Sequence, residues 1–264
     1  METHPPKLQF FFKGFPEDVR FRRHTVPESL EYARGTMYET WYRCIKISPY
    51  ISDLNELGKW RSDSLFNTHE LFGDLQNTTF DTWWIDRGYV LFTENADLRR
   101  VFIRNTSHDL AIFPDTLTMV IPLTVSPATL KKQFDNLLRA HHPEYQRFDR
   151  WQHSTARKPL LASRLTSVSL NLYISVYEKW LQDTTVPQYQ IGQEMGLNPR
   201  YETSPRDTPN EVREKHLQMS LTVSEYLGKA KNLVAHASEG RFPCIDNHPW
   251  VERTTRESNW RHRE

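Results

Sequence analysis

Apolar residues recur along most of this chain at intervals of three and four, the spacing that places side chains on one face of a helix. The pattern starts at Pro27 and ends or kinks at Ser48-Pro49, because the residue before a proline avoids the helical backbone conformation. Further helices are expected at 127–140, 160–181, 187–197 and 209–238. The C-terminal half is therefore predicted to be almost wholly helical.

The densest aromatic stretch, residues 79–92, predicts a core helix in the N-terminal half. Thr79 has the side chain of a helix N-cap, and bulky apolar residues follow at helical spacing. Gly88 predicts a bend or a close approach of another group, because glycine inside a helix otherwise costs about 1 kcal/mol relative to alanine.

Two short segments after the aromatic stretch have the character of strands. Residues 100–103 and 117–125 are rich in β-branched and apolar residues, and Pro122 places the second at a sheet edge or ends it. The predicted fold is therefore mainly α with a small β element (α+β) in the N-terminal half, and a helical C-terminal half. The expected divisions are an irregular N-terminal arm at 1–28, an α+β domain at 29–145, a helical domain with a partial helix-turn-helix-like segment at 155–240, and a polar tail at 241–264.

The last two predicted helices carry specific packing expectations. Gly192 is the small residue that lets two helices approach in a helix-turn-helix motif, but no second helix follows Asn198-Pro199 directly. The final helix is expected to turn its apolar side chains inward, namely Leu217, Leu221, Leu227, Ala230 and Val234.

The composition narrows the classes of protein. A formal net charge of +1 over 264 residues provides no global field for nucleic acid or a membrane, so any basic surface must be local. The two cysteines, Cys44 and Cys244, indicate reduced thiols rather than a disulfide framework. The sequence has no run of about 18 apolar residues and no signal-peptide pattern, which predicts a cytoplasmic protein without a membrane partner.

The most basic window, residues 139–164, also contains aromatic residues. Basic side chains neutralise phosphates and aromatic rings stack on bases, so the combination is typical of a surface for single-stranded or irregular nucleic acid. The alternative is a solvated loop between two helices. The candidate nucleic-acid-binding residues are Arg139, Arg147, Arg150, Trp151, Arg157 and Lys158.

Signals for metal binding or catalysis are weaker. His141-His142, with His153 downstream, fit the end of a helix, where histidines meet the last carbonyl groups, better than a metal site. No phosphate-binding loop, nucleophile elbow or metalloprotease helix occurs, so we expect no cofactor and no metal, and we favour a role without enzymatic activity. A last set is spaced too loosely for a zinc site or a Cys/His nucleophile pair: His236, Cys244 and His248.

Several short motifs together resemble a loosely defined group of uncharacterised bacterial proteins encoded in prophages and integrative elements. The resemblance implies a genomic context of mobile DNA or phage defence, and no activity. The motifs are Phe80-x-x-Trp83-Trp84-x-x-Arg87-Gly88-x-x-Leu91-Phe92, Ile121-Pro122-Leu123, Val176-Tyr177, Gln190-Ile191-Gly192 and Gly240-Arg241-Phe242-Pro243.

The function expected from these observations is that of a non-enzymatic accessory protein of a mobile genetic element or phage-defence locus, with DNA or RNA as its partner. One alternative is a protein-interaction subunit of a larger complex, in which an aromatic surface around Trp84 meets a protein partner from the same locus. The other is a nuclease-type effector, which three converging carboxylates and a histidine would favour.

Overall fold

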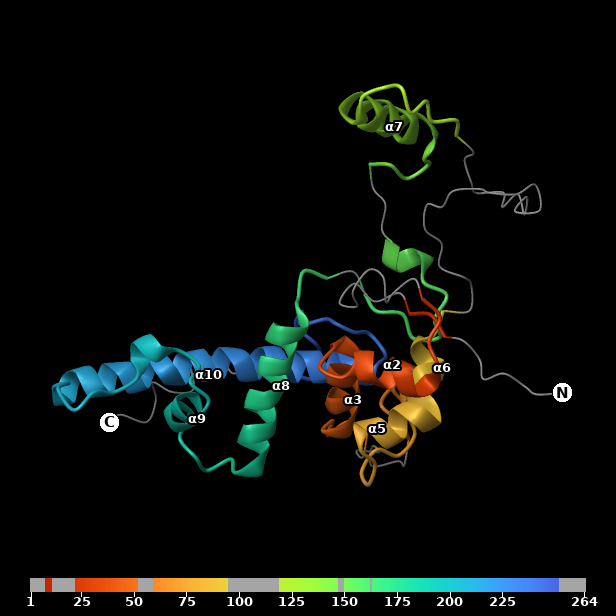
Figure 1. Ribbon diagram of the computed structural model, residues 1–264. Helices are drawn as coiled ribbons and strands as arrows, with labels where there is room; N and C mark the ends of the chain where they lie inside the picture. The colour runs from red at the N-terminus through yellow and green to blue at the C-terminus, as the bar shows by residue number, and fades with distance from the viewer. Residues whose placement is uncertain are drawn as a thin grey trace. The chain divides into compact units, whose positions relative to one another are not determined.

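The computed structural model describes residues 8–10, 22–51, 59–94, 119–146, 150–161 and 163–251. The chain forms two compact units: unit 1 comprises residues 1–98 and 154–264, and unit 2 comprises residues 99–153 (Figure 1). None of the helices in the described ranges is long and apolar enough to cross a membrane.

The predicted small β element is wrong for the described part of the chain, where every named element is a helix. Extended pairing there is limited to two isolated bridges, Leu8 with His24 and Phe10 with Thr93. Residues 119–125, part of one expected strand, are irregular and end in a turn that leads into the next helix. The other expected strand, residues 100–103, lies outside the described residues.

The physical reason is that β-branched and apolar residues indicate a strand only where a neighbouring strand covers them. Val120 and Leu123 are 95% and 90% exposed, so nothing in the described structure covers these two side chains. Pro122 cannot donate a ladder hydrogen bond, and its carbonyl instead accepts the turn hydrogen bond from Val125 N–H.

The helix expected from Pro27 is two helices, α2 (Val26–Ala33) and α3 (Met37–Lys46). Thr25 and Glu28 form a reciprocal capping box at the start of α2. Gly35 has a φ of 70°, a conformation that side-chain-bearing residues rarely adopt, and it separates the two helices. The predicted end before Ser48 is confirmed.

The aromatic stretch is helical throughout but changes pitch in its middle. After α4 (Asp63–Phe72) come α5 (Phe80–Trp83), a π-helical turn η1 (Trp84–Gly88) and α6 (Tyr89–Phe92). Thr79 caps α5 as expected by accepting from Thr82 N–H. A Cβ on Gly88 would lie 2.6 Å from Cζ3 of Trp83, which confirms the predicted close approach at this glycine.

These helices enclose an aromatic core in unit 1. Trp41 and Trp84 are fully buried, and Trp84 stacks on Phe92 with ring centroids 5.8 Å apart. Trp41 stacks on Phe242 at 5.1 Å, and its indole N–H donates to the Ala237 carbonyl at 3.2 Å. The core therefore continues from the N-terminal helices to the end of the last helix, α10 (Pro209–Ser238).

The C-terminal half is helical, as expected, and its two longest helices begin at side-chain caps. Thr166 begins α8 (Ser167–Gln182), which starts later than the expected residue 160. Thr208 begins α10 with a capping box to Glu211, and Gly240, with φ 79°, follows its end. Between them lie α9 (Gln188–Glu194) and a short 3-10 helix, η4 (Pro199–Tyr201).

The packing of α9 on α10 depends on Gly192. A Cβ there would lie 2.5 Å from Cγ and Sδ of Met219, so α9 approaches α10 closely at this glycine, and not a recognition helix. The short η4 and an irregular loop occupy the place in the chain where a recognition helix would have to stand. The expectation that Leu217 and Leu221 point inward is wrong, because they are 57% and 50% exposed while Met219 and Val223 face α9.

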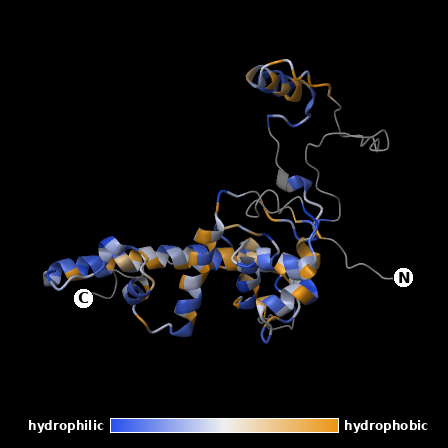
Figure 2. Ribbon diagram, viewed as in Figure 1, coloured by the Kyte–Doolittle hydropathy of each residue, from blue (hydrophilic) through white to orange (hydrophobic). Residues whose placement is uncertain are grey.

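Unit 2 contains the predicted helix after Ser126, α7 (Pro127–His141), and a 3-10 helix, η3 (Arg150–His153). Ser126 Oγ accepts from Thr129 N–H and so caps the start of α7. No residue of α7 is buried, and its apolar residues Phe134 and Leu137 are 40% and 42% exposed. Figure 2 shows both hydrophobic and hydrophilic residues along this helix.

Candidate functional site

The basic window predicted to bind nucleic acid divides between the two units. In unit 2, Arg139 lies 2.9 Å from a carboxylate oxygen of Asp135 and over the ring of Tyr145. The hydrogen bond to Tyr145 and the charge of Asp135 raise the pKa of Arg139. Three further candidates are not fully described by the structure. Arg147 lies outside the described residues, and the side chains of Arg150 and Trp151 are not described.

The other two candidates, Arg157 and Lys158, lie in unit 1 on the irregular segment 154–161. Arg157 is exposed, and no ion pair to it occurs among the described residues. The half-buried Lys158 ammonium donates to Thr68 Oγ1 at 3.2 Å, and burial lowers its pKa. Lys158 Nζ also lies where a Cβ on Gly240 would have to stand, so this side chain packs against the end of α10.

Hydrogen bonds fix the segment 154–161 on unit 1. The buried Glu94 carboxylate accepts from the hydroxyls of Ser154 and Thr155 at 2.6 and 2.7 Å, and from Thr155 N–H at 2.6 Å. At the other end, Leu161 N–H donates to the Phe242 carbonyl at 2.7 Å. This last bond brings together two parts of the chain that are 81 residues apart, the difference between positions 242 and 161.

Arg241 is the residue that the sequence analysis missed. It precedes Phe242, is exposed, and follows the Gly240 that Lys158 contacts. Nothing local in the sequence indicates this position next to segment 154–161, because the two segments meet only through tertiary packing. We use the name cationic strip for Arg157, Lys158 and Arg241 together.

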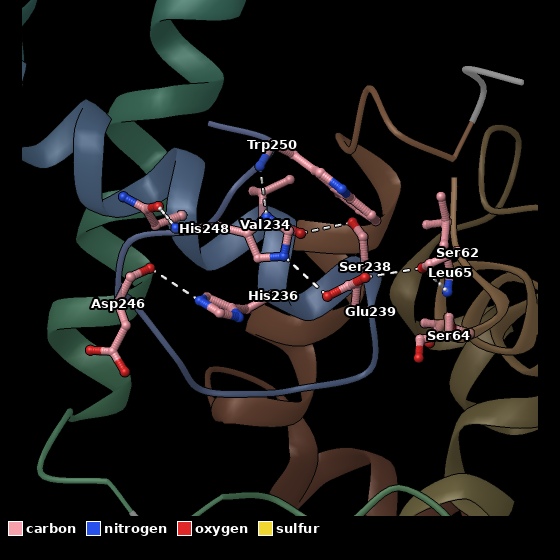
Figure 3. A network of polar contacts seen from close by, with 12 residues as sticks. Ser62, Ser64, Leu65, Val234, His236, Ser238, Glu239, Asp246, His248 and Trp250 are labelled. Carbon is pink, nitrogen blue, oxygen red and sulfur yellow. Dashed lines mark hydrogen bonds and ion pairs between the residues drawn. The ribbon is translucent and has the colours of Figure 1, made fainter. Parts of the chain in front are cut away.

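A polar network lies at the C-terminal end of α10 (Figure 3), and Arg241 of the cationic strip donates its N–H to the His236 carbonyl there. His248 is 6% exposed, and its Nδ1 accepts from Trp250 N–H at 3.2 Å. Its Nε2 therefore carries a proton and donates to Glu239 Oε2 at 3.1 Å. The other oxygen of Glu239 accepts from Ser62 Oγ at 3.0 Å, which ties α10 to the start of α4.

His236 belongs to the same network and has a different partner. Its Nε2 lies 3.0 Å from the Asp246 carbonyl, which can only accept, so Nε2 bears the proton. Its Nδ1 is buried and has no hydrogen-bond partner among the described residues. Burial lowers the pKa of His236, so the neutral form is favoured. The ring meets that of His248 edge to face at 4.7 Å.

Two serines complete the contacts of α10 with the N-terminal helices. Ser238 Oγ donates to the Val234 carbonyl, so Ser48 Oγ must donate the hydrogen of their mutual 2.7 Å hydrogen bond. Ser48 Oγ in turn accepts from Tyr50 N–H at 3.2 Å. The donor and the acceptor of each hydrogen bond are therefore defined, and these bonds hold the turn after α3 against the last turn of α10.

The network is suited to holding structure rather than to chemistry on a substrate. His236 and His248 come together, although their sequence spacing gave no such indication, while Cys244 bonds Asp246 Oδ2 instead. Both histidines are at most 6% exposed, so no substrate reaches their rings. In the part of the chain that the structure describes, no three His, Cys, Asp or Glu residues are placed to hold a metal ion.

Comparisons with known proteins add no relative: no protein-family model, curated protein or solved structure matches this chain.

Proposed function

We propose that this chain is a non-enzymatic nucleic-acid-associated accessory protein of a mobile genetic element or phage-defence locus, acting in the cytoplasm. The observation that carries the proposal is the cationic strip. Arg157 and Arg241 are exposed on two backbone segments that are hydrogen-bonded to each other, and the half-buried Lys158 ammonium beside them donates to Thr68 Oγ1.

The polar network supports this proposal because it fixes the backbone of the strip. Arg241 N–H donates to the His236 carbonyl at 2.9 Å, directly beside the network. The segment that carries Arg157 is fixed by Glu94. Cations on a backbone that is already ordered lose less conformational freedom when they bind phosphate, so more of the electrostatic attraction remains as affinity.

Salt dependence is the direct test, because each phosphate contact releases counterions. We expect that Arg157, Arg241 and the exposed Arg164 each meet one phosphate. Three contacts give a slope of log K against log salt of about −2 on single strands, which corresponds to a roughly 20-fold loss of affinity between 50 and 200 mM salt. Fluorescence anisotropy with labelled single-stranded DNA, RNA and duplex DNA measures this slope.

The variants separate the cationic strip from general charge. The double variant Arg157→Ala/Arg241→Ala should reduce the magnitude of the slope by about 1.4, because two contacts are lost. Arg200→Ala, an exposed arginine on η4, is the matched control and should leave the slope unchanged. Absence of binding at low salt, or equal slopes for both variants, would refute the proposal.

The second candidate, a protein-interaction subunit, needs a surface other than the aromatic stretch. Trp84 is fully buried and cannot meet a partner. Exposed apolar side chains in unit 2 favour this candidate instead, above all Val120 and Leu123. A stoichiometric partner that co-purifies with the wild type and is lost on Leu123→Asp, but kept on Thr124→Asp, would support it.

A further inference from the structure

The outward surface of α10 carries a row of four exposed residues at intervals of four. The row is Arg213, Leu217, Leu221 and Glu225. Its two leucines are 57% and 50% exposed, although neighbouring positions on the opposite side of the helix are fully buried. Single exposed apolar residues are common, but two adjacent leucines at the centre of a row flanked by opposite charges are a candidate contact surface.

The charged side chains at the ends of the row remain exposed to solvent. Arg213 forms no ion pair with any described residue. Glu225 receives the Lys229 ammonium on Oε1 at 2.6 Å, and its side chain remains 61% exposed. The row therefore reads cation, leucine, leucine, anion from its N-terminal to its C-terminal end.

Such a row is complementary to an antiparallel copy of itself. Rows at intervals of four are the ridges that align when two helices cross at about −50°, the commonest crossing in globular proteins. A two-fold axis at the level of position 219, midway between the two leucines, then places Leu217 of each copy against Leu221 of the other copy. Arg213 and Glu225 each lie six residues, or about 9 Å, from this centre, so each arginine meets the glutamate of the other copy.

We infer that this row is the contact of a homodimer, in which two copies of the chain pair through the outer faces of their α10 helices. A two-fold contact buries the same patch on both subunits and needs no second surface. The four leucines supply the apolar centre, and the two Arg213–Glu225 pairs set the antiparallel direction and the register. The close-packed α9 covers the opposite side of α10 and leaves this side open.

Analytical ultracentrifugation of the full chain between about 5 and 200 µM tests the dimer. The wild type should sediment as a concentration-dependent dimer, and Leu217→Lys should be monomeric with an unchanged far-UV circular dichroism spectrum. Val168→Lys is the matched control, because Val168 is an apolar residue on α8 that is 79% exposed and lies off the row. A wild type that stays monomeric, or a dimer that Leu217→Lys leaves intact, overturns the inference.

A charge-reversal cycle tests the register without touching the leucines. Arg213→Glu and Glu225→Lys each place like charges opposite one another and should weaken the dimer by at least 10-fold. The double variant Arg213→Glu/Glu225→Lys restores opposite charges and should recover most of that loss. If the dimer of the double variant dissociates at least as readily as that of the single variant with the weaker dimer, the antiparallel pairing is wrong.

Discussion

A methyl group added at Gly192 probes how α9 is fixed on α10. An ideal Cβ at this position lies 2.5 Å from Cγ and Sδ of Met219 and 3.0 Å from Cγ2 of Val223. Both neighbours are fully buried, so neither can swing into solvent to make room. We therefore expect Gly192→Ala to force a local shift of the two helices.

The magnitude follows from two opposing terms. Replacing glycine by alanine in a helix contributes about 0.5–1 kcal/mol of stability. Overpacking a filled interior costs about 1–3 kcal/mol. Gly228→Ala, on α10, separates the terms, because a Cβ at Gly228 meets nothing within 4 Å and only the first term applies.

Urea denaturation of both variants at one protein concentration measures the difference. Gly192→Ala should be less stable than Gly228→Ala by about 1–3 kcal/mol, the overpacking term alone. In a second comparison, Gly192→Ala should cost less in a Met219→Ala background, because the added methyl group then enters vacated space. The reasoning fails if Gly192→Ala is as stable as Gly228→Ala, since the helices would then not be in close contact at this residue.

Two further predictions concern the buried groups of unit 1. His236 is neutral in the fold because burial, together with the positive charge of Arg241, lowers its pKa from 6.5 against the opposing effect of Asp246. The contribution of this neutral histidine to the free energy of unfolding is complete above about pH 6.5 and is lost as the pH falls from there towards the lowered pKa. The free energy of unfolding of the wild type should therefore exceed that of His236→Phe by less at pH 5.5 than at pH 7.5. A difference that does not change with pH would contradict this prediction. Trp84→Ala should cost about 3–5 kcal/mol in urea denaturation, because a fully buried ring is removed; a loss below about 1 kcal/mol would show that the aromatic stretch is not part of the core.

Helix starts could be predicted from the sequence because their signals are local. The Thr79, Ser126 and Thr208 side chains each accept from a backbone N–H three residues later, so the residues that form the contact also define it in the sequence. The expected strand at 117–125 failed for the opposite reason. A strand requires a neighbour, and its residue pattern says nothing about whether one is present.

The inward face of α10 could not be predicted from periodicity alone. Leucines at 217 and 221 fit a buried helical face as well as Met219 and Val223 do, since both pairs are spaced by four. The structure buries Met219 and Val223 because Gly192 lets α9 approach on that side. Gly192, which lies 27 positions before Met219 in the sequence (219 minus 192), therefore decides which of the two apolar faces is buried.

The candidate site shows the same limit with a functional consequence. A window of basic residues in sequence is not a surface, because Lys158 turns inward to Thr68 while Arg241 arrives from another part of the chain. What brings Arg241 there is the end of α10, where the His236 carbonyl accepts from Arg241 N–H and His248 and Glu239 anchor the chain that follows. The buried histidines, which looked unrelated in the sequence, therefore help to fix the backbone on which Arg241 stands. Removing their contacts should disturb the cationic strip without changing its charge.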